Sequence, residues 1–413
     1  MGVDGRGVRP ERVPNLPRTH FIDTRIYTDP IIFEEERSKI FANVWNFVCH
    51  ESELPNPGCF RTATVAGFPL FVVRQEDGGI RGFYNICRHR QAQVVRSCSG
   101  QAKAFQCFYH LWTYGLDGQL LGVTLPEGYN NTGFDAADFG LREIRVESVA
   151  GLVFVCLSDE AETLREYLGE VASVLERYAP PEGFEVFHYH QAEIKTNWKL
   201  FFENNSERYH TALHWAHRNR ANWGKPGGPA DGWTFVGNGH NYTPFDRGKQ
   251  MGRSKNIGLE ERDRFTLPGH QGNVTSSHHL FPDILLVTIS TVLRIDHLIP
   301  LAPGRTLAEW RGLGVKGEAS DVRNLRIKHH NEFWGYSGAN LPEDITAAES
   351  QWPMMAAGAV RYSVVAREGA AFSDEALRHY YKEWNRRMGR HYWDPFGELE
   401  NTSPKGSNAS AHR

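Results

Sequence analysis

The 413-residue sequence lacks several features that would place it in common classes of protein. It has no run of 18 or more apolar residues, so we expect no helix that spans a bilayer. The N-terminal MGVDGRGVRPERVPNLPRTH lacks the apolar stretch of a signal peptide, which predicts a cytoplasmic protein. The net charge is only −3, so the basic field typical of nucleic-acid and membrane-surface binders is missing.

Cysteine is scarce as well, with six residues at positions 49, 59, 87, 98, 107 and 156. In a long chain without an export signal we expect no disulfide framework, and metal ligation is a better use for some of these thiols. The sequence does contain 40% apolar and 12% aromatic residues, which is enough for a hydrophobic core and excludes a disordered protein. Its length predicts two domains.

The order of sequence patterns indicates where these domains lie. Apolar runs at 59–65, 70–74, 80–86, 141–146 and 151–157, with turns at 76–79 and 116–118, predict a small antiparallel barrel or sandwich. Beyond residue 160, helical periodicity at 161–177, 197–217, 352–360 and 374–388 flanks strand-like runs between 281 and 301. This second pattern predicts an α+β domain, with long loops in the Gly-, Asn- and Arg-rich stretch 220–275.

Two short loops in the first region each offer one thiolate and one imidazole: Cys-x-His at 87–89 and Cys-x-x-His at 107–110. Such ligands hold zinc or iron–sulfur clusters. A zinc finger places both cysteines in one loop and both histidines in the other, whereas a Rieske centre uses two cysteines for one iron and two histidines for the other. One of each in every loop favours a Rieske [2Fe-2S] cluster bound by Cys87, His89, Cys107 and His110.

A second group of possible metal ligands lies in the stretch 197–215, NWKLFFENNSERYHTALHW. In a continuous helix, the spacing of four, three and four residues would place one set of side chains on one face: Glu203, Glu207, His210 and His214. Two imidazoles one turn apart and a carboxylate from elsewhere form the facial triad of non-haem iron oxygenases. The alternative is an amphipathic helix with ordinary core or surface histidines, because the chain contains 19 histidines.

These motifs resemble a known family. FYNICRHRQAQVVRSCSG and FQCFYHLWTYGLDGQL are similar to the Rieske domain of the α (large) subunits of ring-hydroxylating non-haem iron oxygenases. Gln91 and Leu111 stand where the family often has glycine, and Phe108 where it often has proline; these departures affect loop geometry and not the ligands. NWKLFFENNSERYHTALH resembles the family's iron-binding helix, in the form found among oxygenases of benzoate-like acids. The likeness runs from about residue 20 to 390.

The resemblance implies the ligands of a mononuclear Fe(II). His210 and His214 would be the two histidine ligands, with His217 as a weaker rival to His214. The carboxylate would come from the acidic pair at 343–344, where Asp344 is preferred because the second acid of the pair is the usual ligand, and Glu343 is the fallback. On sequence alone, an acidic pair that opens a helix is more often a charge that suits the helix dipole.

The resemblance also implies partners and an electron path. No flavin or NAD fingerprint occurs, so a ferredoxin or a reductase would supply the electrons. In this family the two centres of one subunit are too far apart, and electrons would pass from His110 of one protomer through Glu207 to His210 of its neighbour. Glu207 and Asn204 are therefore the residues assigned to catalysis. The path requires a homotrimer, which in this family commonly adds three small β subunits as α3β3.

The predicted architecture is α+β. An N-terminal arm and helix (1–40) would pack on the catalytic domain. An all-β Rieske [2Fe-2S] domain (41–158) would be inserted before a START-like catalytic domain of helices and antiparallel sheet (159–400). A disordered tail (401–413) would follow. The catalytic pocket is expected between the iron helix and the sheet, lined by Phe202, Leu213, Leu285 and Phe333. Arg294 and Arg361 are candidates for meeting a substrate carboxylate, although such arginines are usually structural ion-pair partners.

The predicted function is that of a terminal oxygenase component. It would use O2 and external electrons to cis-dihydroxylate or monohydroxylate an aromatic compound, with a benzoate-like acid as the expected substrate. An oxidative N- or O-demethylase on the same scaffold is the nearest alternative. An electron-transfer Rieske protein would leave the 250 or so residues after the cluster domain without a purpose, and a zinc-binding interaction module would lack the brown colour of an iron–sulfur cluster.

Overall fold

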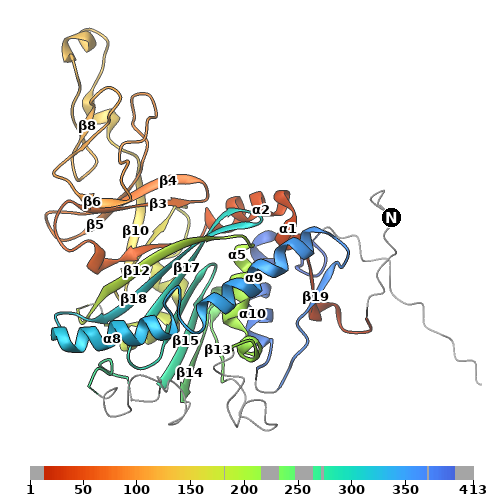
Figure 1. Cartoon of the computed structure of the whole chain (residues 1–413). Coiled ribbons are helices and arrows are strands. Elements are labelled where there is room, and N and C mark those ends of the chain that lie inside the picture. The colour runs from red at the N-terminus through yellow and green to blue at the C-terminus, as the bar shows by residue number, and fades with distance from the viewer. Residues whose placement is uncertain are drawn as a thin grey trace, which may run out of the picture.

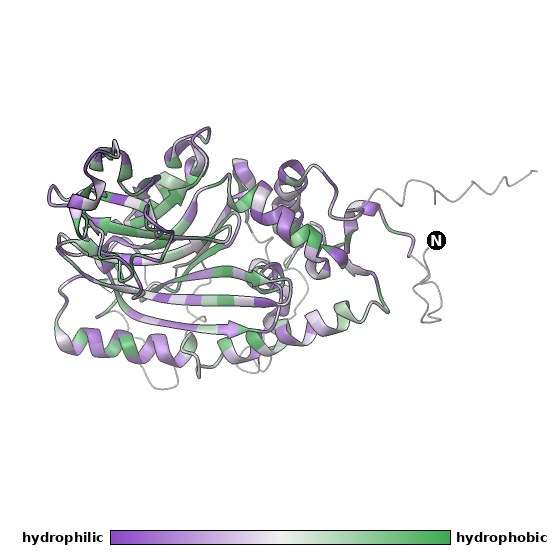
Figure 2. Cartoon of the chain, turned by 90° about the horizontal axis from the view of Figure 1, so that it is seen from above, coloured by the Kyte–Doolittle hydropathy of each residue, from purple (hydrophilic) through white to green (hydrophobic). Residues whose placement is uncertain are grey.

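The computed structural model describes residues 14–180, 182–214, 232–246, 264–270, 274–369 and 372–395. Short strands form an N-terminal β region, and a larger sheet with helices against it forms the rest of the molecule (Figure 1). Among the described residues, no helix has the length and apolar character needed to cross a membrane. Hydrophobic and hydrophilic positions instead alternate along helices and strands, as expected for elements with one buried face (Figure 2).

The N-terminal β region contains one seven-stranded and one three-stranded antiparallel sheet. Across the larger sheet the strands are β2 (Asn46–His50), β11 (Leu152–Cys156), β10 (Glu143–Val149), β5 (Ile80–Tyr84), β4 (Phe68–Arg74), β3 (Cys59–Val65) and β6 (Ser99–Gln101). The smaller sheet has β7 (Phe105–Gln106), β8 (Thr113–Tyr114) and β9 (Leu120–Gly122), and it projects away from the rest of the molecule (Figure 1). The five expected strands are present, with ends shifted by a few residues.

The second region is built on a seven-stranded antiparallel sheet. Its strands are, in order, β12 (Phe184–Ile194), β18 (Arg305–Val315), β17 (Leu293–Ala302), β16 (Ile284–Thr288), β15 (Val274–Leu280), β14 (Asn241–Asp246) and β13 (Thr234–Phe235). The described helices are α1 (Arg25–Thr28), α2 (Pro30–Glu36), α3 (Leu164–Leu168), α4 (Glu170–Tyr178), α5 (Trp198–Ser206), α8 (Ser320–Phe333), α9 (Leu341–Ala356) and α10 (Glu375–Met388). Three expected helices differ: 161–177 is broken at Gly169, whose φ is +55°, the helix expected at 197–217 ends at Ser206, and the helix expected at 352–360 begins at Leu341 and ends at Ala356.

Cross-strand pairing fixes which side chains of this sheet face α5. Residues directly opposite each other on neighbouring strands point to the same face. One continuous row of such partners crosses the sheet, from His190 to Trp310, Asp296, Leu285, His279 and Asn241. Phe201 of α5 lies 6.1 Å from the Trp310 ring and Phe202 lies 5.8 Å from the His279 ring, measured between centroids. The row is therefore the floor beneath α5, and many of its members are polar.

Both ends of the chain contribute to the core around α5. Strand β1 (Phe21–Asp23) pairs with β19 (Tyr362–Val364), and the side chains of Ile26 and Ile32 share a buried cluster with α5 and α10. The ammonium of Lys199 in α5 lies 2.7 Å from the carboxylate of Glu36 in α2, and both side chains are buried. The indole N–H groups of Trp198 and Trp384 also donate to this carboxylate. A buried, fully partnered ion pair thus ties the N-terminal helix to the helix that precedes the site.

Replacing Lys199 with methionine leaves the Glu36 carboxylate buried without its cation. We expect Lys199→Met to cost about 3–5 kcal/mol of unfolding free energy in urea titrations. Adding Glu36→Gln should recover part of this loss, since the amide carries no buried charge and its oxygen still accepts from one of the two indoles. Glu143→Gln breaks the exposed pair with Arg81 and should cost less than about 1 kcal/mol. A Lys199→Met cost no larger than that of Glu143→Gln would contradict the role of the buried pair.

Candidate metal centres

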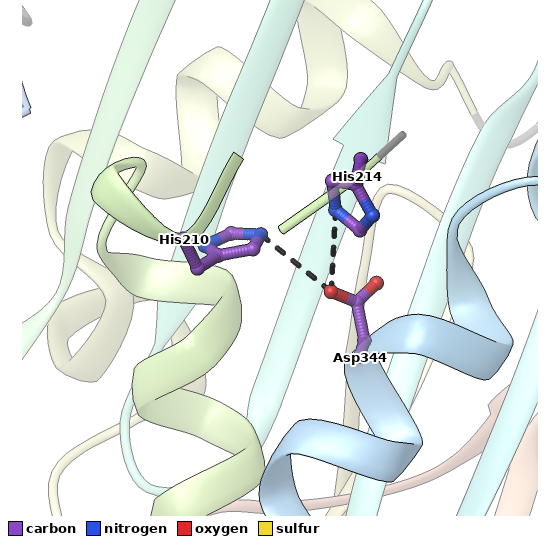
Figure 3. Close-up of side chains that lie close together, drawn as sticks. All are labelled: His210, His214 and Asp344. Carbon is purple, nitrogen blue, oxygen red and sulfur yellow. Dashed lines mark ion pairs between the residues drawn. The ribbon is translucent and has the colours of Figure 1, made fainter. Parts of the chain in front are cut away.

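Two histidines and one aspartate converge beneath the end of α5. The Nε2 atoms of His214 and His210 lie 3.3 and 3.6 Å from the same oxygen, Oδ1 of Asp344 (Figure 3). One ligand atom from each residue lies within 4.8 Å of the others, and no other group of at least three His, Cys, Asp or Glu side chains in the described chain meets this condition. Two imidazoles and one carboxylate are the donor set of the facial triad.

The local backbone differs from the continuous helix that the sequence predicted. Helix α5 ends at Ser206, and Glu207 is extended, with φ −100° and ψ 135°. The Ser206 hydroxyl and the Asn205 amide donate to the carbonyls of Phe202 and Phe201, so side chains satisfy the last turn of the helix. His210 then lies in a 3-10 turn (Tyr209–Ala212). The prediction of one shared helical face for Glu203, Glu207, His210 and His214 is therefore wrong, although His210 and His214 still meet.

Each histidine has its second ring nitrogen fixed by a partner. Nδ1 of His210 lies 2.5 Å from the backbone oxygen of Glu207, while the Glu207 carboxylate accepts the backbone N–H of His210. Nδ1 of His214 lies 2.8 Å from the carboxylate of Glu343. These partners place the proton on Nδ1 and leave both Nε2 atoms available as ligands. Glu343, the fallback ligand of the sequence prediction, lies behind His214; sequence reasoning missed this role, although the acidic pair was its signal.

The electrostatics of the cluster fit a cation. Oδ1 of Asp344 is buried and makes no hydrogen bond, and burial raises the pKa of this carboxyl. Burial lowers the pKa of His210, but Glu207 and Asp344 outweigh burial, so the pKa lies above its ordinary value. An unpaired carboxylate oxygen aimed between two imidazole nitrogens is what a divalent metal would satisfy. The residues present therefore fit a mononuclear iron.

The other residues predicted on this stretch lie elsewhere. Glu203 is buried and accepts hydrogen bonds from the hydroxyls of Tyr27 and Tyr381; burial raises its pKa to about 7. It belongs to the core around α5 and not to the metal cluster. Asn204 is buried with its Oδ1 unpaired. His217 lies outside the described residues.

The two cysteine loops of the N-terminal region follow the same backbone path. The backbone N–H of Cys87 donates to the carbonyl oxygen of Ala92 at 2.8 Å, and the N–H of Gln91 donates to the carbonyl oxygen of Cys87 at 2.9 Å. In the second loop, the Cys107 and Leu111 N–H groups donate to Trp112 and Cys107, both at 2.9 Å. Gln91 and Leu111, the residues found in place of glycine, both have φ near +59°. Both loops thus keep a left-handed residue four positions after the cysteine, at a cost of about 1–2 kcal/mol each.

The four predicted cluster ligands come together at the tips of these loops. Cys87 and Cys107 are buried free thiols. Burial is the largest cause that raises the pKa of Cys107, and its hydrogen bond with Cys87 raises this pKa as well. The rings of His89 and His110 lie 4.4 Å apart. Two adjacent thiols and two adjacent imidazoles fit a [2Fe-2S] cluster with one cysteine pair and one histidine pair. The hydroxyl of Tyr114 lies 3.2 Å from Sγ of Cys87, a contact that sequence reasoning missed and no sequence pattern marked.

Comparison with known proteins assigns these two groups of residues to a family. Residues 44–131 match the Rieske [2Fe-2S] domain, and residues 181–390 match the ring-hydroxylating α subunit (catalytic domain). This order of domains defines a Rieske non-haem iron oxygenase, with a [2Fe-2S] cluster and a mononuclear iron as cofactors. The chain belongs to the family of ring-hydroxylating oxygenase α subunits, oxidoreductases that take electrons from a ferredoxin or a reductase. The predicted α+β fold class, enzyme class and cofactors are confirmed.

Several relatives span almost the whole chain. It is 38% identical over 380 residues to 2-aminobenzenesulfonate 2,3-dioxygenase subunit α of Alcaligenes sp., covering 91% of this chain and 95% of the relative. It is 33% identical over 397 residues to methanesulfonate monooxygenase hydroxylase subunit α of Methylosulfonomonas methylovora, covering 91% and 93%. Naphthalene 1,2-dioxygenase from Rhodococcus sp., bound to indole, has the same fold, with a TM-score of 0.75 at 24% identity over 89% of this chain and 94% of that one.

Asp344→Ala removes the carboxylate at the centre of the cluster. We expect the purified variant to lose the mononuclear iron and keep the two irons and two sulfides of the [2Fe-2S] cluster. Glu343→Gln is the matched comparison, because it perturbs only the partner of His214 and should weaken iron binding by about 10–100-fold. Iron and sulfide analysis checks both results. Full iron content in Asp344→Ala, or a larger loss in Glu343→Gln, would contradict this ligand assignment.

Proposed function

We propose that this chain is an oxygenase component that hydroxylates an aromatic acid at an iron held by His210, His214 and Asp344. The convergence of two Nε2 atoms on one buried, unpaired carboxylate oxygen carries this proposal. When bound, the iron supplies the site for dioxygen activation. These three residues would hold the iron, and the partners on Nδ1 orient both imidazoles so that each Nε2 faces Asp344.

The proposed domain limits follow the packing. We place a Rieske domain at 41–158, which binds the cluster through Cys87, His89, Cys107 and His110, and a catalytic domain at 159–400. The segment before residue 41 belongs with the catalytic domain, because Ile22, Ile26 and Tyr27 are in its buried cluster. The three-stranded sheet with the second cysteine loop projects away from the catalytic sheet, so the two centres of one chain lie in separate parts of the molecule (Figure 1).

Exposure of residues beside each centre supports an electron path between protomers. Around His110, the side chains of Phe108 and Tyr109 are 57% and 55% exposed, which is unusual for large aromatic groups. At the other centre, the Glu207 side chain is 20% exposed beside Tyr209, which is 53% exposed. We propose that a head-to-tail homotrimer, with or without β subunits, brings His110 of one protomer to Glu207 of the next. Glu207 then couples to His210 through the hydrogen bonds that it already makes.

The substrate proposal combines the family with its relatives. One similar protein is by name a dioxygenase of an aromatic sulfonate, and another is a monooxygenase of methanesulfonate. Both substrates are anions, which agrees with the aromatic acid predicted from the iron-binding stretch. Dihydroxylation of an arene consumes one O2, two electrons and two protons; monohydroxylation consumes the same and releases one water. Arg294 is paired with Asp296 at 2.7 Å and Arg361 with Asp23 at 3.5 Å, so neither places an uncompensated charge near a substrate.

Oxygen uptake with a panel of substrates tests this function. With its electron-transfer partners, the protein should consume O2 and form hydroxylated product from at least one of benzoate, 2-aminobenzoate, benzenesulfonate and 2-aminobenzenesulfonate. Asp344→Ala should show no coupled uptake. Products formed only from methanesulfonate, or formaldehyde released from N- or O-methyl compounds, would show instead that the substrate is not an aromatic acid or that the protein is a demethylase.

Glu207→Gln tests the path between protomers. The amide keeps the size of the side chain but removes the carboxylate that accepts the His210 N–H and faces the neighbour. We expect the visible spectrum of the cluster and the iron content to stay unchanged, while the rate at which reduced cluster is reoxidised in the presence of substrate falls by about tenfold or more. Glu343→Gln, which holds the other histidine, serves as the comparison, because its effect should follow its iron content. Normal reoxidation in Glu207→Gln would contradict the bridging role.

A further inference from the structure

Beside α5, a group of buried polar atoms lacks hydrogen-bond partners. Both ring nitrogens of His279 and both polar side-chain atoms of Asn241 are unpaired, and these side chains are 0% and 1% exposed. The two residues are direct cross-strand partners on the floor beneath α5. Nε1 of Trp233 is buried and unpaired as well, and its ring lies 4.8 Å from that of His279. Buried polar groups are almost always satisfied in proteins, so this cluster requires an explanation.

The charge next to these atoms is positive. The buried guanidinium of Arg208 lies 5.0 Å from the centre of the Trp233 ring. Burial and the nearby Arg208 charge lower the pKa of His279, so its imidazole is neutral and offers one N–H donor. Trp233 is a donor only, Asn241 offers two N–H groups, and arginine offers five. His279, Trp233 and Asn241 therefore place several unpaired N–H donors beside a guanidinium, the chemistry that binds carboxylates and sulfonates.

The group is also connected to the segment that carries the proposed iron ligands. Arg208 precedes His210 by two residues, and Phe202 of α5 lies against His279. Leu285 is the cross-strand neighbour of His279 on the floor of the same face, and it is apolar and buried. A polar end beside an apolar floor matches a ring that carries one anionic substituent.

We propose that Arg208, Trp233, His279 and Asn241 form the subsite for the anionic group of the substrate, a carboxylate or a sulfonate. This inference rests on the proposed function for the ring that the anion carries. It explains why N–H donors of His279, Trp233 and Asn241 are left unpaired in the free protein: the ligand supplies their acceptors. A binding site built this way reduces the stability of the free protein, since each buried unpaired polar group is unfavourable.

Replacing His279 and Asn241 with apolar residues of similar size tests the subsite. The Kd values of radiolabelled benzoate, benzenesulfonate and neutral benzamide are measured by equilibrium dialysis on the full-length protein with both iron centres loaded. In His279→Phe and in Asn241→Leu we expect the Kd of the preferred anion to rise about tenfold or more, and the Kd of benzamide to stay within about twofold. The more tightly bound anion of the wild type shows whether the site prefers a carboxylate or a sulfonate.

His278 provides a matched control. It is the neighbouring residue, 2% exposed, with its Nε2 also unpaired, but it lies on the opposite face of the sheet against Tyr178 and Tyr242. His278→Phe should leave all three Kd values unchanged. Without ligand, His279→Phe and Asn241→Leu should melt at or above the wild-type temperature, because an unpaired polar group has been removed. A purely structural role would instead lower the melting temperature and leave anion binding intact.

The outcomes separate this inference from the proposed function. Unchanged anion binding in His279→Phe and Asn241→Leu, equal losses in His278→Phe, or no binding of either anion to the wild type would overturn the subsite. If no aromatic acid is hydroxylated, but benzoate or benzenesulfonate binds and its Kd rises in His279→Phe, the proposed function fails and the anion subsite stands.

Discussion

One carboxylate oxygen, Oδ1 of Asp344, lies buried between two imidazole nitrogens with no hydrogen bond of its own, and the surrounding structure is arranged around that oxygen. Helix α9 delivers it within its first turn, immediately after Glu343, which orients His214. Helix α5 ends at Ser206, so the chain can turn and bring the His210 ring beside the Asp344 carboxylate (Figure 3). A negative charge held in this position is unfavourable without a cation, and a bound metal would offset that cost.

The need to bring His210 to this oxygen also explains the contacts that hold α5 on its other side. Lys199 and Glu36 fix the start of the helix through a buried ion pair, and Glu203 fixes its next turn through two tyrosine hydroxyls. These contacts involve the N-terminal segment and α10, which are distant in sequence. A helix of nine residues has little stability by itself, so its direction depends on these contacts. The ligands that follow it are positioned by residues from both ends of the chain.

Much of this arrangement could be predicted from the sequence, and the limits have physical causes. The two cysteine loops were predictable because each holds two of the four ligands within a few residues, and turn chemistry is local. The strands at 59–65 and 70–74 were predictable from alternation and turns. The end of α5 was not, because Asn205 and Ser206 stop the helix through hydrogen bonds to its own carbonyls, whereas residue spacing alone continues it to His214. The partner of His214 also required the structure, since the sequence offered Glu343 only as the fallback metal ligand and not as a partner of His214.

The pairing of β2 with β11 has a consequence for the history of the chain. Val155 lies opposite Asn46 and Leu152 opposite His50, so the polypeptide enters and leaves the cluster-binding region on two adjacent strands. A unit whose two connections lie side by side can be inserted into a host, or exchanged for another, with few contacts broken elsewhere. The cluster-binding region is in this sense a separate unit that joins the catalytic region through two adjacent strands. Recombination at these two strands would exchange the cluster-binding region, and with it the redox partner, while the substrate site stays intact.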